Sequence, residues 1–117
     1  DLYNSMDIAL DTQPYSGATT SCEALLMGVP VITLKGKDMV ECLTASVLAS
    51  AGQHQWIAEN EREYIDIAIK LASSMKNSPR SAMERKRLRD KIKSSALGQP
   101  QRIAKELEKL YLKTSYF

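Results

Sequence analysis

The sequence contains too little cysteine and histidine for a disulfide framework or a zinc site. Its 117 residues include two cysteines, Cys22 and Cys42, and a single histidine, His54. The cysteines form no C-x-x-C pair, and so sparse a set is typical of a reduced, cytoplasmic protein. A structural zinc site needs about four such ligands. We therefore expect no metal site and a cytoplasmic location.

Long apolar runs and a strong excess of one charge are also missing. No stretch reaches the roughly 18 apolar residues of a transmembrane helix, and the polar, acidic N-terminus does not resemble a signal peptide. A net charge of +2 is too small to indicate a nucleic-acid or membrane partner. The remaining composition, 44% hydrophobic and 26% charged, is typical of a globular domain with one modest core.

Two short apolar segments, residues 8–10 and 29–34, are predicted to be strands. Both are apolar throughout, which is typical of strands buried on both faces of a parallel sheet. Two strands are too few for such a sheet, because sheets usually contain about four to six. The sequence also begins with Asp1 instead of methionine. We therefore interpret residues 1–117 as the C-terminal piece of a longer chain, whose N-terminal remainder would be its partner.

A turn and a short helix are predicted to connect the two strands. Residues 12–17 contain proline and glycine, which favour a turn. The run T-S-C-E that starts at Thr20 matches a capping box, which begins a helix, and Gly28 is expected to end that helix. Strand, helix and strand together make a right-handed βαβ unit.

Several helices are predicted to follow the βαβ unit. Residues 38–51 have apolar residues at helical spacing, and residues 56–58 are predicted to form a short edge strand. Asn60, with Glu63 three residues later, is expected to cap an amphipathic helix that reaches residue 75.

The C-terminal residues 78–117 are predicted to form two further helices. The first begins at Ser78-Pro79, because proline suits the first helical position, and runs to about Ser94. The second restarts at Pro100 and carries an apolar stripe that should be buried, made of Ile103, Ala104, Leu107, Leu110 and Tyr111.

The start of the first helix is the main candidate for a binding site. A helix N-terminus presents unpaired N–H groups and about half a positive charge, so it can hold an anion. Residues 16–18 are small and would let a phosphate approach the backbone, while Thr19 and Thr20 would add hydroxyl donors. The competing interpretation is that Thr20 and Glu23 only cap the helix. The residues alone leave both interpretations open.

Residues 7–36 read DIALDTQPYSGATTSCEALLMGVPVITLKG, and this stretch resembles the C-terminal signature of family 41 glycosyltransferases. These are the O-linked N-acetylglucosamine transferases, their SPINDLY-type relatives and bacterial homologues with tetratricopeptide repeats. The likeness continues through ASVLASAG (45–52), IAENEREYIDIAIKLA (57–72) and LEKLYLK (107–113). It implies a GT-B fold built from two Rossmann-like halves. This chain would be the C-terminal part of the donor-binding half, an α/β unit in which βαβ is followed by several helices.

The resemblance also implies which residues bind the donor. In the family the helix start holds the donor diphosphate, and an acidic residue one turn later contacts the ribose. The matching positions here are Gly17, Ala18, Thr19, Thr20 and Glu23. No catalytic residue is assigned, because the family's lysine and base-contacting residues would lie upstream of Asp1. The fragment alone is therefore expected to be inactive.

Three departures from the animal O-linked N-acetylglucosamine transferases leave the donor open. Those enzymes have histidine at the position of Ala18 and aspartate at that of Glu23, and relatives usually carry arginine at that of Cys42. The donor expected first is UDP-GlcNAc, with UDP-glucose and GDP-fucose as alternatives.

The activity implied by the resemblance is an inverting sugar transfer to serine or threonine of acceptor proteins, without a metal or other cofactor. The sequence has no D-x-D pair to hold a divalent ion, so amides and hydroxyls would stabilise the leaving diphosphate. The expected partners are the nucleotide-sugar and the acceptor protein. The isolated fragment could also form a homodimer through exposed sheet edges.

Residues 80–93 offer a rival interpretation of a different class. They hold seven basic and two acidic residues, which would suit a non-catalytic helical module that binds RNA or a protein. A solvated helix is favoured instead, because no aromatic residues interleave with the basic ones.

Four expectations concern individual side chains. Asp11 should brace the turn after the first strand, with a direct ligand contact as the less favoured alternative. His54 should lie on a surface loop, and Trp56 should be a packing anchor. The methionines expected to fill the core are Met27, Met39, Met75 and Met83.

Overall fold

The protein folds around three parallel strands. The structure is a computed structural model that describes residues 2–76 and 80–115. Its strands lie side by side in the order β1 (Ala9–Leu10), β2 (Val31–Leu34) and β3 (Ile57–Ala58). Ala9 pairs with Val31, and Thr33 pairs with Ile57. The predicted βαβ unit and the predicted edge strand are confirmed, and the fold is α/β.

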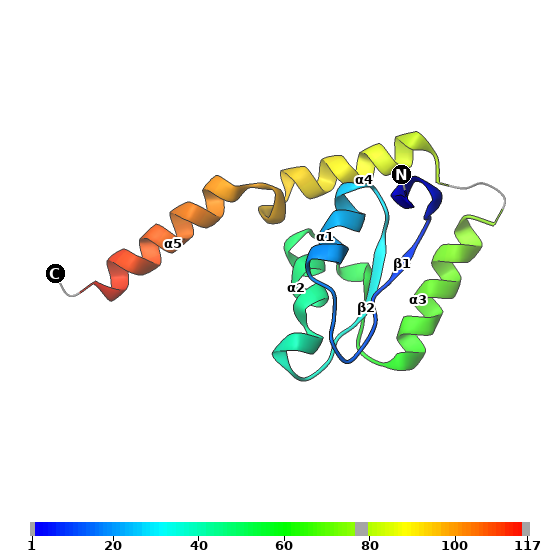
Figure 1. The fold of residues 1–117 in the computed structure, drawn as a ribbon, viewed down its shortest axis with the longest axis horizontal. Helices are drawn as coiled ribbons and strands as arrows, with labels where there is room; N and C mark the ends of the chain where they lie inside the picture. The colour runs from blue at the N-terminus through cyan, green and yellow to red at the C-terminus, as the bar shows by residue number, and fades with distance from the viewer. Residues whose placement is uncertain (1, 77–79, 116–117) are drawn as a thin grey trace.

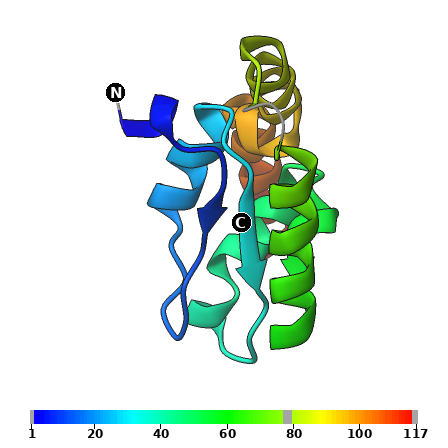
Figure 2. The same cartoon turned by 90° about the vertical axis from the view of Figure 1, so that its right-hand side faces the viewer.

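Helices lie on both sides of the sheet. Figure 2 shows α1 (Thr19–Leu26) and α3 (Glu61–Ser74) on opposite sides of β1 and β2. In Figure 1, α2 (Leu43–Ser50) lies near α1, α4 (Ala82–Ser94) crosses the end of α1, and α5 (Pro100–Thr114) extends away from the sheet. The described residues also form four 3-10 helices: η1 (Leu2–Ser5), η2 (Met39–Glu41), η3 (His54–Trp56) and η4 (Ala96–Gly98). None of the described helices combines the length and apolar character needed to cross a membrane.

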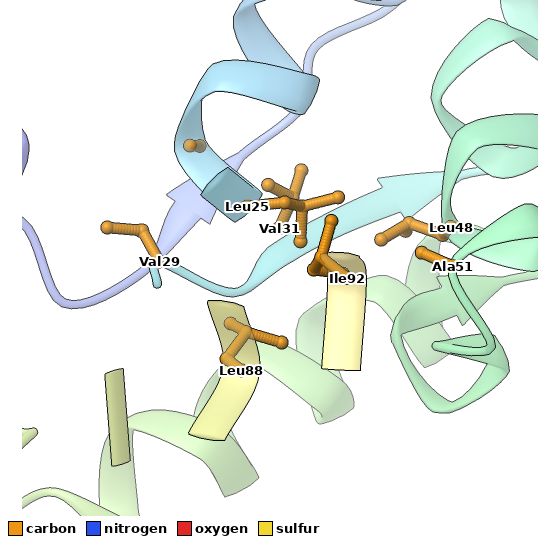
Figure 3. Close-up of a cluster of buried hydrophobic side chains, with 8 residues drawn as sticks. Leu25, Val29, Val31, Leu48, Ala51, Leu88 and Ile92 are labelled. Carbon is orange, nitrogen blue, oxygen red and sulfur yellow. The ribbon is translucent and has the colours of Figure 1, made fainter. Parts of the chain in front are cut away.

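One cluster of buried apolar side chains joins α1, α2, α4 and β2. Figure 3 shows Leu25, Val31, Leu48 and Ile92 gathered in this cluster, and each is at most 1% exposed. Leu88 lies one helical turn before Ile92 and faces the same cluster. Burial of such a side chain contributes about 1.5–3 kcal/mol relative to leaving it in water. These contacts therefore fix α4 against the βαβ unit.

Local sequence signals set most helix boundaries. α1 ends before Gly28, whose φ of +76° suits a residue without a Cβ. The side chain of Asn60 accepts a hydrogen bond from the Glu63 amide at 2.9 Å and begins α3, as predicted. Ser81 and Glu84 form a capping box that begins α4. The helix start predicted at Ser78-Pro79 lies outside the described residues.

The predicted helix over residues 38–51 is wrong in its first turn. Met39–Glu41 forms η2, and α2 begins only at Leu43. The cause is the carboxylate of Glu41, which accepts hydrogen bonds from the amides of Lys37 at 2.8 Å and Asp38 at 3.3 Å. These bonds close a tight loop over residues 37–41, so α2 starts after this loop and not at residue 38.

Acid is expected to loosen the starts of η2 and α4. The amides of Lys37 and Asp38 lower the pKa of Glu41, and Ser81 lowers the pKa of Glu84 through its amide and hydroxyl. A carboxyl group with a lowered folded-state pKa stabilises the fold above its unfolded pKa, and this is lost as pH falls through the folded pKa. The usual pKa of a glutamate side chain is 4.5. Below this pH, Tm should fall more steeply in the unmodified protein than in a variant that carries both Glu41→Gln and Glu84→Gln. Parallel Tm curves would contradict this.

Several predictions of burial are wrong. Leu10 is 55% exposed, because β1 is an edge strand and no element of the described chain lies beyond it. The stripe on α5 is exposed as well, with Leu107 at 45% and Leu110 at 56%, because α5 projects away from the sheet (Figure 1). Met39 and Met83 are 79% and 67% exposed, so they do not fill the core.

Candidate functional site

Asp11 holds the turn that follows β1. Its carboxylate accepts hydrogen bonds from the amide of Gly17 at 2.8 Å and from the hydroxyl of Thr33 at 2.7 Å. The hydroxyl of Tyr64, on α3, donates to the backbone carbonyl of Asp11 at 2.7 Å. Burial and then the charge of Asp11 raise the pKa of Tyr64, so this hydroxyl remains a donor at neutral pH. The prediction that Asp11 braces the turn is confirmed.

Ser16 ties the same turn to the loop before α2. It is fully buried, and its amide and hydroxyl both donate to the carbonyl of Val40, at 3.0 Å and 2.7 Å. Its hydroxyl oxygen also accepts a hydrogen bond from the amide of Leu43 at 3.1 Å. The expectation that Ser16 lets a phosphate approach the backbone is therefore wrong, because its polar groups bind other parts of the protein.

Two hydroxyl groups hold the carbonyl of Gly17. Ser21 donates to this carbonyl at 2.8 Å, and Thr44 of α2 donates to it as well. The two hydroxyl oxygens also lie 2.9 Å apart, and because each hydroxyl has one proton, a hydrogen bond between them would replace one of the two bonds to the carbonyl. Gly17 is thus fixed at both its amide and its carbonyl, which sets the direction in which the chain enters α1.

Ala18, Thr19 and Thr20 form an exposed start of α1. Among the residues that the structure describes, no side chain caps this helix, and no acceptor binds these three amides. The predicted capping box of Thr20 and Glu23 is wrong, since the N-cap position of α1 is Ala18, two residues earlier, and Glu23 binds Tyr3 instead. The helix therefore presents free donors and its positive end to solvent.

Three hollows line the carboxyl ends of the strands in the described part of the chain, and one of them reaches this helix start. A hollow of about 220 Å³ lies between β1 and α1 and includes Thr20 in its lining. It shares Thr12 with a second hollow of about 450 Å³, which shares Gln13 and Leu34 with a third of about 650 Å³. In open α/β sheets, ligands bind at this end of the strands.

Glu23 is paired with a residue near the N-terminus of the chain. The hydroxyl of Tyr3, in η1, donates to the carboxylate of Glu23 at 3.1 Å. The pKa of Tyr3 is raised by desolvation first and then by this carboxylate. The sequence gives no signal for the pair, because the two residues lie 20 positions apart in different elements.

The basic segment 80–93 is not a uniformly solvated helix. The side chain of Arg85 is only 11% exposed and lies 3.4 Å from Asp7. Its guanidinium donates to the carbonyls of Tyr3 at 3.1 Å and Met6 at 2.7 Å. Arg85 therefore serves the fold, which removes it from the surface that the rival RNA-binding or protein-binding interpretation needs.

The remaining single-residue expectations concern His54, Trp56 and metal binding. His54 is exposed in η3, and Trp56 packs against the core as predicted. Within the described ranges 2–76 and 80–115, no group of three or more His, Cys, Asp or Glu residues could hold a metal ion.

Comparison with known proteins decides the family. The sequence model described as glycosyl transferase family 41 matches residues 4–107. The chain belongs to glycosyl transferase family 41. This family 41 chain is 38% identical over 109 residues to a probable UDP-N-acetylglucosamine–peptide N-acetylglucosaminyltransferase SPINDLY of Petunia hybrida, covering 93% of this chain and 11% of that protein. It is 39% identical over 111 residues to the SPINDLY protein of Hordeum vulgare, again covering 93% and 11%.

A solved structure shows the same fold. An O-GlcNAc transferase mutant of Thermobaculum terrenum superposes with a TM-score of 0.76 at 43% identity, covering 93% of this family 41 chain and 20% of that chain. The resemblance inferred from residues 7–36 and the predicted fold class, an α/β part of a GT-B glycosyltransferase, are thereby confirmed. The chain spans about a tenth of the length of the SPINDLY proteins that it matches.

Proposed function

We propose that this chain supplies the diphosphate-binding part of the donor site of a glycosyltransferase. That enzyme would transfer N-acetylglucosamine from UDP-GlcNAc to serine or threonine of proteins. The observation that carries the proposal is the uncapped start of α1, where Ala18, Thr19 and Thr20 expose unpaired amides and two hydroxyls at the carboxyl end of the sheet. The names of the family 41 relatives support the reaction and the donor.

The chemistry of this helix start suits a leaving diphosphate. When the bond between sugar and phosphate breaks, negative charge accumulates on the diphosphate oxygens. The positive end of α1, equivalent to about half an elementary charge, and the donors of residues 18–20 stabilise that charge as it develops. These donors are already fixed in place, because Gly17 is held by Asp11 and by Thr44. In this proposal no metal ion or cofactor besides the nucleotide-sugar is required.

Glu23 would bind the ribose in this arrangement. It lies one helical turn after Thr19 and Thr20, and it is exposed. The hydroxyl of Tyr3 donates to its Oε2 atom, and no group of the described chain hydrogen-bonds to Oε1, which can accept a hydrogen bond from a ribose hydroxyl. UDP-GlcNAc, UDP-glucose and GDP-fucose share the diphosphate and the ribose, so contacts to these two groups do not distinguish the three donors. A transfer assay with all three donors identifies the sugar.

Removing the two hydroxyls at the helix start tests the proposal. In the full-length protein, Thr19→Ala and Thr20→Ala should each weaken UDP binding about tenfold, because a hydrogen bond to a charged group contributes about 1.5–3 kcal/mol. The double variant should lose about a hundredfold, as measured by calorimetry. A matched control is Thr114→Ala, which removes an exposed hydroxyl from α5. Affinity that is unchanged in the double variant would remove this helix start from the donor site.

A further inference from the structure

Asp11 uses its carboxylate and both of its backbone polar groups in hydrogen bonds to other parts of the fold. Its two carboxylate oxygens bind different parts of the fold, with Oδ1 accepting from the Gly17 amide and Oδ2 from the Thr33 hydroxyl. Its backbone amide donates to Ile32 at 2.9 Å, and its carbonyl accepts from Tyr64. Asp11 thus joins β1, β2 and α3 to the turn that leads into α1.

We propose that Asp11 is a positioning residue for the donor diphosphate and does not itself touch the ligand. This inference rests on the proposed function, because it assigns Asp11 to the same site. Gly17 comes immediately before the exposed residues 18–20, and its amide is held by Asp11 at 2.8 Å. The carboxylate therefore fixes the turn from behind, and the three unpaired amides keep the orientation that a diphosphate requires.

The charge of Asp11 argues against a direct contact with the ligand. A carboxylate beside an anionic diphosphate is repelled by it, so the negative charge opposes binding. Both carboxylate oxygens already have donors inside the protein, and both contacts are short enough to be full hydrogen bonds. The useful property of Asp11 is consequently its pair of acceptor atoms and not its charge.

This distinction predicts different results for two substitutions of Asp11. Asparagine keeps an acceptor for Gly17, and its amide group can donate to Thr33, whose hydroxyl can turn to accept. Alanine removes both bonds and frees the turn. In the full-length protein, Asp11→Ala should weaken UDP binding by about tenfold or more, while Asp11→Asn should stay within about threefold of the unmodified protein.

A stability control separates positioning from general damage. Ile92→Val shortens a buried side chain of α4, which packs at the other end of α1, and it should lower Tm without changing UDP affinity. Loss of UDP affinity in Ile92→Val equal to that in Asp11→Ala would overturn the inference. An Asp11→Asn variant as weak as Asp11→Ala would also overturn it, because the ionised group itself would then act on the ligand.

Hydrogen exchange at Gly17 keeps this test apart from that of the proposed function. In Asp11→Ala the Gly17 amide loses its acceptor, so its exchange with solvent should rise about tenfold or more, with or without UDP. In Asp11→Asn the exchange should stay near that of the unmodified protein. An unmodified protein that fails to bind UDP refutes the proposed function. Unchanged exchange in Asp11→Ala refutes the positioning role, whatever binds.

Discussion

Replacing Gly28 with alanine is expected to destabilise the protein by about 2–5 kcal/mol, combining a left-handed backbone cost with overpacking. Gly28 ends α1 with a φ of +76°, a conformation that residues with a Cβ rarely adopt. A Cβ at this position would also lie 2.6 Å from the carbonyl oxygen and 2.8 Å from the Cα of Arg85. Both atoms belong to the backbone of α4, so the clash can be relieved only by moving the whole helix off the core.

Gly52 provides a matched control for this substitution. It ends α2 with a similar φ of +71°, but a Cβ there would meet no atom within 4 Å. Gly52→Ala should therefore carry only the conformational cost, about 1–2 kcal/mol. Denaturant unfolding of the two variants separates the steric part from the backbone part. Equal losses of stability in Gly28→Ala and Gly52→Ala would show that α4 does not press on α1 as described.

Replacing Arg85 with alanine should cost about 2–4 kcal/mol of unfolding free energy, since a hydrogen bond from a charged group contributes about 1.5–3 kcal/mol. The guanidinium joins the carbonyls of Tyr3 and Met6 to α4, and alanine leaves both without this donor. Its ion pair with Asp7 contributes less, because the side chain of Asp7 is 44% exposed and its charge is screened by water. Arg85→Lys should recover only part of the loss, because an ammonium group lacks the planar fork that reaches separate acceptors.

Two further substitutions test this account of Arg85. Arg87 is exposed on the same helix, and within the described residues its one side-chain hydrogen bond is a weak one to the sulfur of Met83 at 3.9 Å, so Arg87→Ala should change stability by less than about 0.5 kcal/mol. Asp7→Asn should have a smaller effect than Arg85→Ala, because both carbonyl contacts remain. If Asp7→Asn cost as much as Arg85→Ala, the ion pair and not the carbonyls would be the stabilising interaction.

The elements that sequence predicted well are those with strong local signals. Asn60 begins α3 through a hydrogen bond to a residue three positions away, and Gly28 ends α1 through its own backbone geometry. The apolar run of β2 needs no partner to be recognised as a buried strand. Each of these signals lies within a few residues of the boundary it sets, so the fold class could be predicted from the sequence.

The errors come from contacts between distant residues. Ser16 is buried because the carbonyl of Val40 accepts from it and the amide of Leu43 donates to it, 24 and 27 positions along the chain. The break of the predicted helix 38–51 at Cys42 is an exception, because Glu41 binds amides only three and four positions before it. The donor positions Thr19 and Thr20 were predicted from small residues at a helix start. Asp11 was the one supporting group that the sequence predicted. Tyr64 and Thr44 could not be predicted, because they lie 53 and 27 positions from the residues that they bind.

The contacts of Arg85 have a consequence for how this part of the chain folds during synthesis. Arg85 binds residues that precede it by 78 to 82 positions. A ribosome therefore releases β1, α1 and β2 long before α4 exists, and until then Leu25 and Val29 lack their cover. A nascent chain that stalls before α4 has been synthesised would expose this apolar surface to other proteins. Chaperone capture should accordingly peak in that interval and end once α4 has emerged.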